Sequence, residues 1–219
     1  MPLDLTTPIS CLITDGRTTE TTGSSSAEFT RLFVLVGACV EAGVALVQLR
    51  EKALRPRVLY ELTRRAAELT RHSETRLIVN DRADIALAAR ADGVQLTTRS
   101  LDPLVVRDIS PPDFLIGVST HTLAEAQAAN RTGADFALFG PVFDTPSKRA
   151  YGAPLGLELL REAAHALAPF PLLAIGGITR ERIPQVINAG ARGIAAIGLF
   201  RDESELEAVV NEVRESRGE

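Results

Sequence analysis

The chain has 219 residues, of which 45% are hydrophobic and 24% are charged, and its formal net charge is −4. This composition supports one sizeable buried core and excludes an intrinsically disordered protein. It also predicts no nucleic-acid partner, because a mildly acidic chain has no overall positive field to attract nucleic acid, and no membrane span, because no apolar run approaches the roughly 18 residues required.

Short apolar runs alternate with amphipathic segments along the whole chain. The runs predict strands at 10–15, 44–50, 76–81, 92–96, 114–119, 135–141, 171–177 and 192–198, and the segments between them predict helices near 27–41, 54–72, 82–90, 101–109, 122–131, 155–167, 180–188 and 203–216. Eight alternating pairs predict an α/β protein with a parallel sheet, arranged as a compact (β/α)8 TIM barrel in a single domain over 1–219. A doubly wound open sheet is the alternative, but no GxGxxG follows the first run.

Several residues mark the ends of these predicted helices. Thr122 with Glu125 forms a capping-box pattern, and Thr179 precedes another helix as an expected N-cap. Three segments end in glycine before the next strand, at 41–43, 131–133 and 188–190.

Two residue types are unusually scarce. Cys11 and Cys39 are the only cysteines, and both lie in apolar stretches, which predicts buried free thiols in a cytoplasmic protein. The N-terminal MPLDLTTPIS has neither the basic start nor the apolar stretch of a secretion signal. Lys52 and Lys148 are the only lysines beside 22 arginines, so they are candidates for positions that need a compact ammonium group.

In a barrel of this kind the chemistry lies at the carboxyl ends of the strands. The second predicted strand ends in QLREK, which places Gln48, Arg50 and Lys52 on one face by the period-two rule. Two cations beside an amide suit a phosphate or a diphosphate. The alternative is a solvated strand end with Glu51 as the counter-ion.

The third and fifth predicted strands also end in polar residues. Asp81, after Asn80, has two interpretations: a cap for the next helix, or a carboxylate ligand of Mg²⁺ shared with substrate phosphates. Ser119 and His121 follow the fifth strand. His121 is the only histidine at a predicted strand end, so it is the histidine candidate for acid–base chemistry, and an ordinary loop residue is the alternative.

Three further segments predict phosphate binding. The long loop 140–154 carries Thr145, Ser147 and Lys148, a set of two hydroxyls and an ammonium group. The seventh and eighth strands end in AIGGIT and AAIGLF, where Gly177 and the Ile197–Gly198 turn let backbone amides approach an anion, aided by the next helix N-terminus. The sequence therefore predicts two anion sites, and a reaction between a small molecule carrying a phosphate and one carrying a diphosphate.

The chain resembles the family of thiamine phosphate synthase and its close relative, the thiazole tautomerase. The matching segments are LITD (12–15), QLREK (48–52), IVNDRADIAL (78–87), ADGVQL (91–96), IGVSTHTLAEA (116–126), FGPVFDTPSK (139–148), PLGLELL (154–160) and AIGGIT (174–179). They cover nearly the whole chain in the family's order. The resemblance implies the barrel and a cytoplasmic enzyme of thiamine biosynthesis with small phosphorylated substrates, and it leaves a homo-oligomer open.

The implied reaction is the transfer of hydroxymethylpyrimidine from its diphosphate to thiazole phosphate, with pyrophosphate released first. The resemblance assigns Arg50, Lys52, Ser119 and Lys148 to the diphosphate as catalytic residues, together with the contact residue Asn80. It assigns Gln48 to the pyrimidine and Asp81 to Mg²⁺. It assigns Thr145, Ser147, Gly177, Ile197 and Gly198 to the thiazole phosphate.

Two positions depart from the synthase pattern. Ser100 stands where the synthase has a second acidic Mg²⁺ ligand, beside Arg99, so the expectation of Mg²⁺ is weakened; Asp102 is a substitute ligand only if the loop shifts. Gly198 stands where a serine is common. The altered 95–100 segment resembles the tautomerase, an isomerase in which His121 would move the proton, whereas the complete set of diphosphate residues resembles the synthase. A phosphate-binding paralogue without turnover is the third reading.

Overall fold

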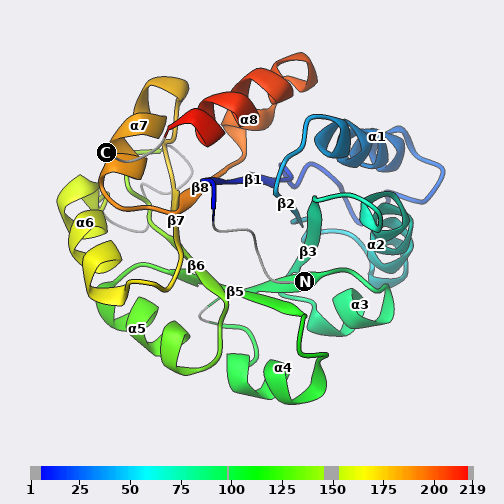
Figure 1. The fold of residues 1–219 in the computed structure, drawn as a ribbon. Coiled ribbons are helices and arrows are strands. Elements are labelled where there is room, and N and C mark those ends of the chain that lie inside the picture. The colour runs from blue at the N-terminus through cyan, green and yellow to red at the C-terminus, as the bar shows by residue number, and fades with distance from the viewer. Residues whose placement is uncertain (1–5, 98, 146–152, 217–219) are drawn as a thin grey trace.

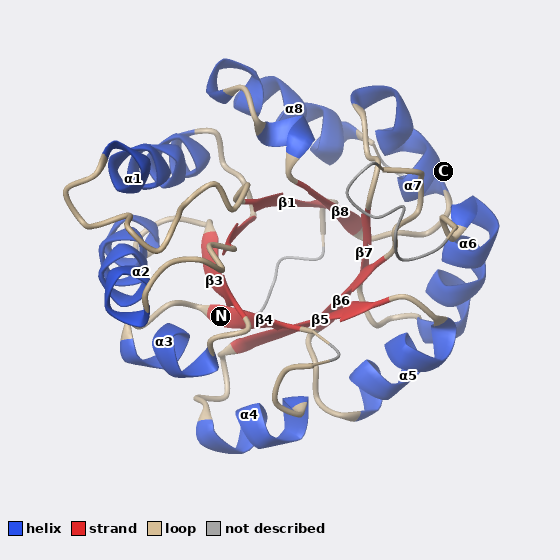
Figure 2. Cartoon of the chain, turned by 180° about the vertical axis from the view of Figure 1, so that it is seen from behind, coloured by secondary structure: helices blue, strands red, loops and turns tan. Residues whose placement is uncertain are grey.

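The computed structural model describes residues 6–97, 99–145 and 153–216. Eight parallel strands close into a barrel in the order β1-β2-β3-β4-β5-β6-β7-β8. Helices form a ring around the strands, as Figure 1 shows along the barrel and Figure 2 shows from behind. The predicted (β/α)8 barrel is confirmed, and the open-sheet alternative is wrong.

The elements lie close to their predicted positions. The strands are β1 (Ile9–Ile13), β2 (Leu46–Leu49), β3 (Arg76–Asn80), β4 (Gly93–Leu96), β5 (Leu115–Thr120), β6 (Phe136–Phe139), β7 (Leu172–Ile175) and β8 (Gly193–Ala196). The α-helices are α1 (Ala27–Glu41), α2 (Pro56–Thr70), α3 (Ala83–Ala88), α4 (Pro103–Ile109), α5 (Leu123–Arg131), α6 (Gly156–Leu167), α7 (Ile183–Asn188) and α8 (Leu206–Glu215). Short 3₁₀ turns η2 (Arg180–Arg182), η3 (Gly198–Phe200) and η4 (Glu203–Glu205) follow β7 and β8.

Side-chain caps and glycines set the ends of the helices. The Thr122 hydroxyl accepts a hydrogen bond from the Glu125 amide at 3.1 Å, which confirms the predicted N-terminus of α5. Thr179 is the N-cap residue of the 3₁₀ turn η2, as predicted, with extended backbone and no side-chain cap hydrogen bond. The predicted glycine ends have left-handed backbone, with φ of 70° at Gly43, 79° at Gly133 and 96° at Gly190.

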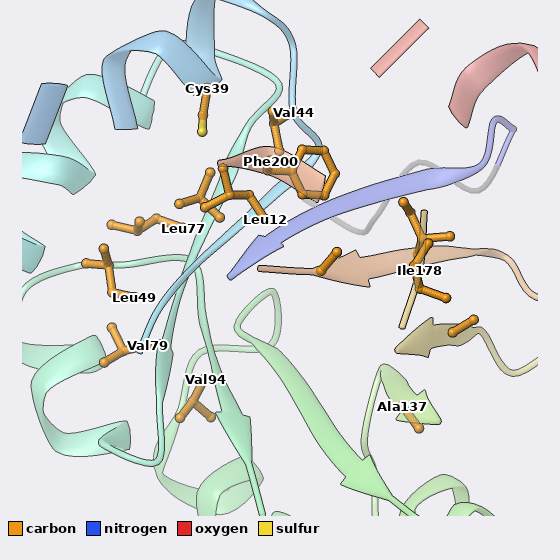
Figure 3. Packing of buried hydrophobic residues seen from close by; sticks show 14 of the residues in the cluster. Leu12, Cys39, Val44, Leu49, Leu77, Val79, Val94, Ala137, Ile178 and Phe200 are labelled. Atoms are coloured by element: carbon orange, nitrogen blue, oxygen red, sulfur yellow. The ribbon is translucent and has the colours of Figure 1, made fainter. Parts of the chain in front are cut away.

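The strands separate two apolar layers. Leu46, Ile78, Phe136 and Leu173 belong to the cluster inside the barrel. Strand residues with the opposite orientation join the helices in a second cluster, and Figure 3 shows Leu12, Leu49, Leu77, Val79 and Val94 among its members. Successive side chains of a strand point alternately into the barrel and toward the helices. The inward residues nearest the carboxyl ends of β2 to β5 are all polar. They are Gln48, Asn80, Gln95 and Ser119.

Both cysteines are buried and unpaired, as predicted: Cys11 lies inside the barrel, and Cys39 on α1 lies in the outer layer (Figure 3). Burial raises the pKa of each thiol to about 12, with a smaller contribution from the nearby Cys39 in the case of Cys11 and from Glu203 in the case of Cys39. Over the described part of the chain, no helix has the length and apolar character needed to cross a bilayer.

Candidate active site

The parallel barrel brings the carboxyl ends of all eight strands to one rim. Gln48, Asn80 and Ser119 occupy inward positions just below this rim. Arg50, Lys52, Asp81 and His121 follow the ends of β2, β3 and β5 and lie at the same rim. Lys148, predicted to bind the diphosphate, and Ser147, predicted to bind the thiazole phosphate, lie outside the described residues. The other residues predicted for the diphosphate all lie at this rim.

Two buried glutamines, at inward positions of β2 and β4 below the rim, leave part of their hydrogen-bonding capacity unused. Gln48 is 2% exposed and Gln95 is 1% exposed. The Gln95 amide nitrogen donates to the Ser119 hydroxyl at 3.1 Å. Three buried side-chain atoms in the described structure have no partner: Gln48 Nε2 and Gln95 Oε1 below the rim, and Thr75 Oγ1 just before β3, at the opposite end of the barrel. Buried polar atoms without partners are costly, so the donor and the acceptor below the rim point to a ligand.

Gln95 was not among the predicted site residues. The signal for it is present in DGVQL, where one amide interrupts an apolar strand two residues after an inward glycine. An inward position close to the carboxyl end of a barrel strand is where a ligand contact is expected. The same rule that selected Gln48 therefore applies to Gln95.

Some residues of the QLREK segment lie at the site, and others are hydrogen-bonded to the end of β1 and to the loop that follows it. The Arg50 amide donates to the Thr14 hydroxyl at 2.8 Å. The Glu51 carboxylate is 3% exposed and accepts hydrogen bonds from Thr18 Oγ1 at 2.6 Å and from the Gly16 amide at 3.2 Å. Glu51 therefore anchors that loop, and the interpretation of Glu51 as a solvated counter-ion is wrong. Because β2 ends at Leu49, the strand periodicity does not extend to Lys52, which lies in an exposed turn.

Asp81 has a left-handed backbone with φ of 63°, which is uncommon for a residue with a side chain. Its amide donates to the Gln95 carbonyl at 2.8 Å, and its carboxylate accepts a hydrogen bond from the Ser100 hydroxyl. The N-cap of α3 is Arg82, without a side-chain cap bond, so the interpretation of Asp81 as a helix cap is wrong. Backbone held in this region is typical of functional sites.

The surroundings of Asp81 suit Mg²⁺ only in part. The Ser100 hydroxyl also accepts a hydrogen bond from the Thr97 amide at 2.7 Å. Asp102, the suggested substitute ligand, instead caps α4 by accepting from the Leu104 amide at 2.8 Å. Among the described residues, no three His, Cys, Asp or Glu side chains gather closely enough to hold a metal ion. One carboxylate fits Mg²⁺ when substrate phosphate oxygens complete the coordination.

His121 is exposed at the rim and is held in one orientation. Its Nδ1 is hydrogen-bonded to the Gly140 carbonyl oxygen, and its amide donates to the Glu125 carboxylate at 2.6 Å. Because a carbonyl oxygen only accepts, Nδ1 carries the proton, and in the neutral ring Nε2 is then the acceptor. The side chain therefore presents a basic nitrogen at this rim.

Glycines shape the ends of β7 and β8 where the second anion site is predicted. Gly176 and Gly177 have φ of 96° and 65°, and a Cβ on Gly177 would lie 2.7 Å from the Asp144 carbonyl oxygen. Ile197 is 37% exposed, and the space around the Cα of Gly198 is open. A short 3₁₀ turn, and not an α-helix, is the next element after each of these strands. The groups available to a phosphate are therefore the backbone amides of the turns, and not the N-terminus of an α-helix as expected.

Comparison with known proteins agrees with this geometry. Residues 20–200 match the family model described as thiamine monophosphate synthase. The thiamine-phosphate synthase of Moorella thermoacetica is 41% identical over 181 residues, covering 83% of this chain and 86% of the relative. That of Chlorobium luteolum is 39% identical over 218 residues, covering 96% and 97%.

Solved structures give the same result. The thiamine phosphate pyrophosphorylase of Pyrococcus furiosus superposes with a TM-score of 0.76 at 32% identity, covering 94% of this chain and 96% of that one. A 3-hexulose-6-phosphate synthase, at 19% identity and a TM-score of 0.66, shares the fold alone. The family match and the identity to these relatives both extend over most of the barrel, and we conclude that the chain belongs to the thiamine monophosphate synthase family.

Proposed function

We propose that this chain is a thiamine-phosphate synthase, a transferase that couples hydroxymethylpyrimidine diphosphate to thiazole phosphate and releases pyrophosphate. The observation that carries the proposal is the pair of unpartnered buried amide atoms, Gln48 Nε2 and Gln95 Oε1, below a rim with two cations. A pyrimidine ring nitrogen accepts a hydrogen bond, and an amino group on the ring donates one. The two glutamines supply the complementary donor and acceptor.

The diphosphate would lie at the rim above these glutamines. Arg50, Lys52 and Lys148 provide positive charge, and Asn80 and Ser119 provide hydrogen-bond donors. As the bond from the pyrimidine methylene carbon to the diphosphate oxygen breaks, negative charge builds up on the leaving oxygen, and these groups stabilise it. The electron-poor methylene carbon is then captured by the thiazole nitrogen.

We propose that Asp81 holds Mg²⁺ together with oxygens of the diphosphate. The bound ion would add positive charge next to the leaving group. A single protein carboxylate and a hydroxyl at Ser100 give the free protein little affinity for the ion, so we expect the metal to bind with the substrate.

The thiazole phosphate would lie on the far side of the rim. Backbone amides near Gly177 and the Ile197–Gly198 turn would bind it from the ends of β7 and β8, together with the hydroxyl of Thr145; Ser147, the other predicted hydroxyl, lies outside the described residues. In this proposal the nucleophile approaches from the side of the barrel mouth opposite the diphosphate. The positions of Gly177, Ile197, Gly198 and Thr145 at the ends of β6, β7 and β8 support the assignment.

Incubation of the purified protein with both precursors and Mg²⁺ tests the proposal by formation of thiamine phosphate. Lys148→Ala should abolish coupling, because the leaving group loses a positive charge. His121→Ala should leave most of the coupling, since no proton transfer by a histidine is needed. The proposal would be contradicted if the parent protein formed no thiamine phosphate but had a tautomerase activity that His121→Ala lost. It would also be contradicted if both Lys148→Ala and His121→Ala coupled the precursors at nearly the parent rate.

We also propose that the protein works in the cytoplasm on small phosphorylated substrates. The two unpaired buried thiols suit a reducing compartment. The isomerase alternative is not favoured, because the relatives from Moorella thermoacetica and Chlorobium luteolum carry the name thiamine-phosphate synthase and the one from Pyrococcus furiosus the name thiamine phosphate pyrophosphorylase.

A further inference from the structure

Arg182, the last residue of η2, links two loops of the rim. Its Nη1 donates to the Gly177 carbonyl oxygen at 2.7 Å. Its Cζ lies 4.4 Å from the centre of the Phe143 ring, in the loop after β6. One guanidinium group therefore makes a charge-assisted hydrogen bond to the turn after β7 and stacks on an aromatic side chain of the preceding loop.

These two segments are already in close contact through their backbones. The Phe143 amide donates to the Gly176 carbonyl at 3.1 Å, and the Val142 amide donates to the Ile175 carbonyl at 2.8 Å. A Cβ on Gly177 would lie 2.8 Å from the Phe143 Cβ, which leaves no room for a side chain. The loop therefore packs directly against the turn, backbone to backbone.

The hydrogen bond from Arg182 also fixes a peptide plane. The Gly177 carbonyl belongs to the peptide that joins Gly177 to Ile178, and this peptide is planar. Gly177 itself has φ of 65°, a backbone conformation that glycine adopts readily and other residues avoid. By holding the carbonyl, Arg182 fixes the direction of the Ile178 amide and of the turn as a whole.

We infer that Arg182 is a positioning residue that holds residues 142–145, after β6, and the turn after β7 together as one phosphate-binding unit. The inference rests on the proposed function, which places the thiazole phosphate at Thr145 and Gly177. Arg182 acts through Phe143 and Gly177 and contributes to the affinity for the phosphorylated acceptor. It has no role at the diphosphate, whose predicted partners follow β2, β3 and β5.

Arg180 offers a matched control on the same turn. Its guanidinium pairs with Glu205 at 2.8 Å and with Glu212 through Nε at 2.9 Å, on η4 and α8. Arg180→Gln removes the same charge from η2 without touching either rim segment. Arg182→Lys keeps the charge but loses the planar group that stacks on the ring.

The test measures KM for each substrate and kcat in Arg182→Gln, Arg182→Lys and Arg180→Gln. We expect Arg182→Gln and Arg182→Lys to raise KM for thiazole phosphate about tenfold, with KM for the pyrimidine diphosphate unchanged. Arg180→Gln should match the parent protein. Phe143→Leu should give the same phenotype, and it should add little in the Arg182→Gln background, because both changes break one contact. An equal rise in both KM values, or parent behaviour in Arg182→Lys, would overturn the inference.

A binding measurement separates this inference from the proposed function. Inorganic phosphate should raise the melting temperature of the parent protein and of Arg180→Gln, and it should have a smaller effect on Arg182→Gln. If the parent forms no thiamine phosphate but shows this pattern, the proposed function fails and the role of Arg182 stands. If phosphate stabilises all three proteins equally, or none of them, the role of Arg182 is wrong whether or not coupling occurs.

Discussion

At the scale of single residues, the site is marked by groups whose placement costs stability. Gln48 and Gln95 each bury an amide atom without a partner, and Asp81 holds a left-handed backbone. A protein selected for stability alone would remove such features, since each carries an unfavourable free energy of about 1–3 kcal/mol. Their presence at one rim is a physical reason to place the substrate there.

Replacement of Gln95 by methionine tests this reasoning. The change keeps the volume, removes the unpartnered acceptor and breaks one hydrogen bond to Ser119, so the free energy of unfolding should rise or stay within about 1 kcal/mol of the parent value. The kcat/KM for the pyrimidine diphosphate should fall at least about tenfold, because a buried polar contact to the ring is lost. Urea unfolding and steady-state kinetics measure the two effects, with the exposed Gln185→Met as control. A large loss of stability with unchanged kinetics would show that Gln95 is structural.

Ser100 offers a gain-of-function test of the metal site. Its hydroxyl is hydrogen-bonded to the Asp81 carboxylate, so Ser100→Asp places a second carboxylate beside the first. We expect tighter binding of Mg²⁺, because carboxylate oxygens are its preferred protein ligands. The Mg²⁺ concentration for half-maximal coupling should fall, and Mn²⁺ should bind to the substrate-free variant more tightly than to the parent. Ser110→Asp, at the end of α4, is the control for added negative charge. Unchanged metal affinity in Ser100→Asp would place the ion away from Asp81.

At the scale of elements, the loops above the strands are held by specific side chains of neighbouring elements. Glu51, directly after β2, accepts three hydrogen bonds from residues 16–18 of the loop after β1. Arg182, after β7, donates a hydrogen bond to Gly177 in its own turn and stacks on Phe143 in the loop after β6. In both cases a charged side chain that follows one strand holds the loop that follows the preceding strand.

Weakening of the Glu51 anchor should release the loop after β1. Glu51→Gln exchanges one acceptor oxygen for a donor facing N–H and O–H groups, so we expect a loss of about 1–3 kcal/mol in the free energy of unfolding. Trypsin should cut after Arg17 faster, since the Arg17 side chain is 64% exposed and its backbone loses its neighbouring contacts. Glu20→Gln, exposed on the same loop, is the matched control. Equal cleavage rates in the two variants would contradict the anchoring role.

The sequence predicted the elements well because their signals are local. Apolar runs located all eight strands, and glycines such as Gly43 and Gly133 located helix ends through a backbone conformation that other residues avoid. The site was predicted only in part, because its remaining features depend on contacts between distant segments. Glu51 is hydrogen-bonded to residues 16–18, and Arg182 stacks on Phe143, 39 positions earlier. No rule of sequence spacing predicts contacts over such separations.

At the scale of the whole molecule, the residues that stabilise the barrel and the residues of the candidate site lie at different heights along the barrel axis. Inward residues in the lower part, such as Leu46, Ile78 and Phe136, are apolar and fully buried. Inward residues near the carboxyl ends of β2 to β5, such as Gln48 and Asn80, are polar. Substitutions near the rim therefore change activity with little effect on the shared core, as expected for this architecture.

The two buried thiols predict how the stability of the whole molecule depends on pH. Burial raises the pKa of Cys11 and of Cys39 from 9.0 to about 12, so the folded state keeps both protons over a range in which the unfolded chain loses them. The unfolded state then binds fewer protons, and the free energy of unfolding falls as pH rises from about 9 toward 12. Each thiol contributes a slope of up to about 1.4 kcal/mol per pH unit.

Urea unfolding at pH 8, 9, 10 and 10.5 measures this slope. The control is the double variant Cys11→Ala/Cys39→Ala, which is less stable at pH 8 because it has cavities but loses stability less steeply above pH 9. Tyrosine and lysine also titrate in this range, and they contribute equally to both proteins, so the difference between the slopes isolates the thiols. Equal slopes would show that the thiols are accessible to solvent in the folded state. Rapid reaction of both thiols with a disulfide reagent in the absence of urea would also show that they are accessible in the folded state. That result would contradict the tight packing around Cys11 inside the barrel and around Cys39 between α1 and the strands.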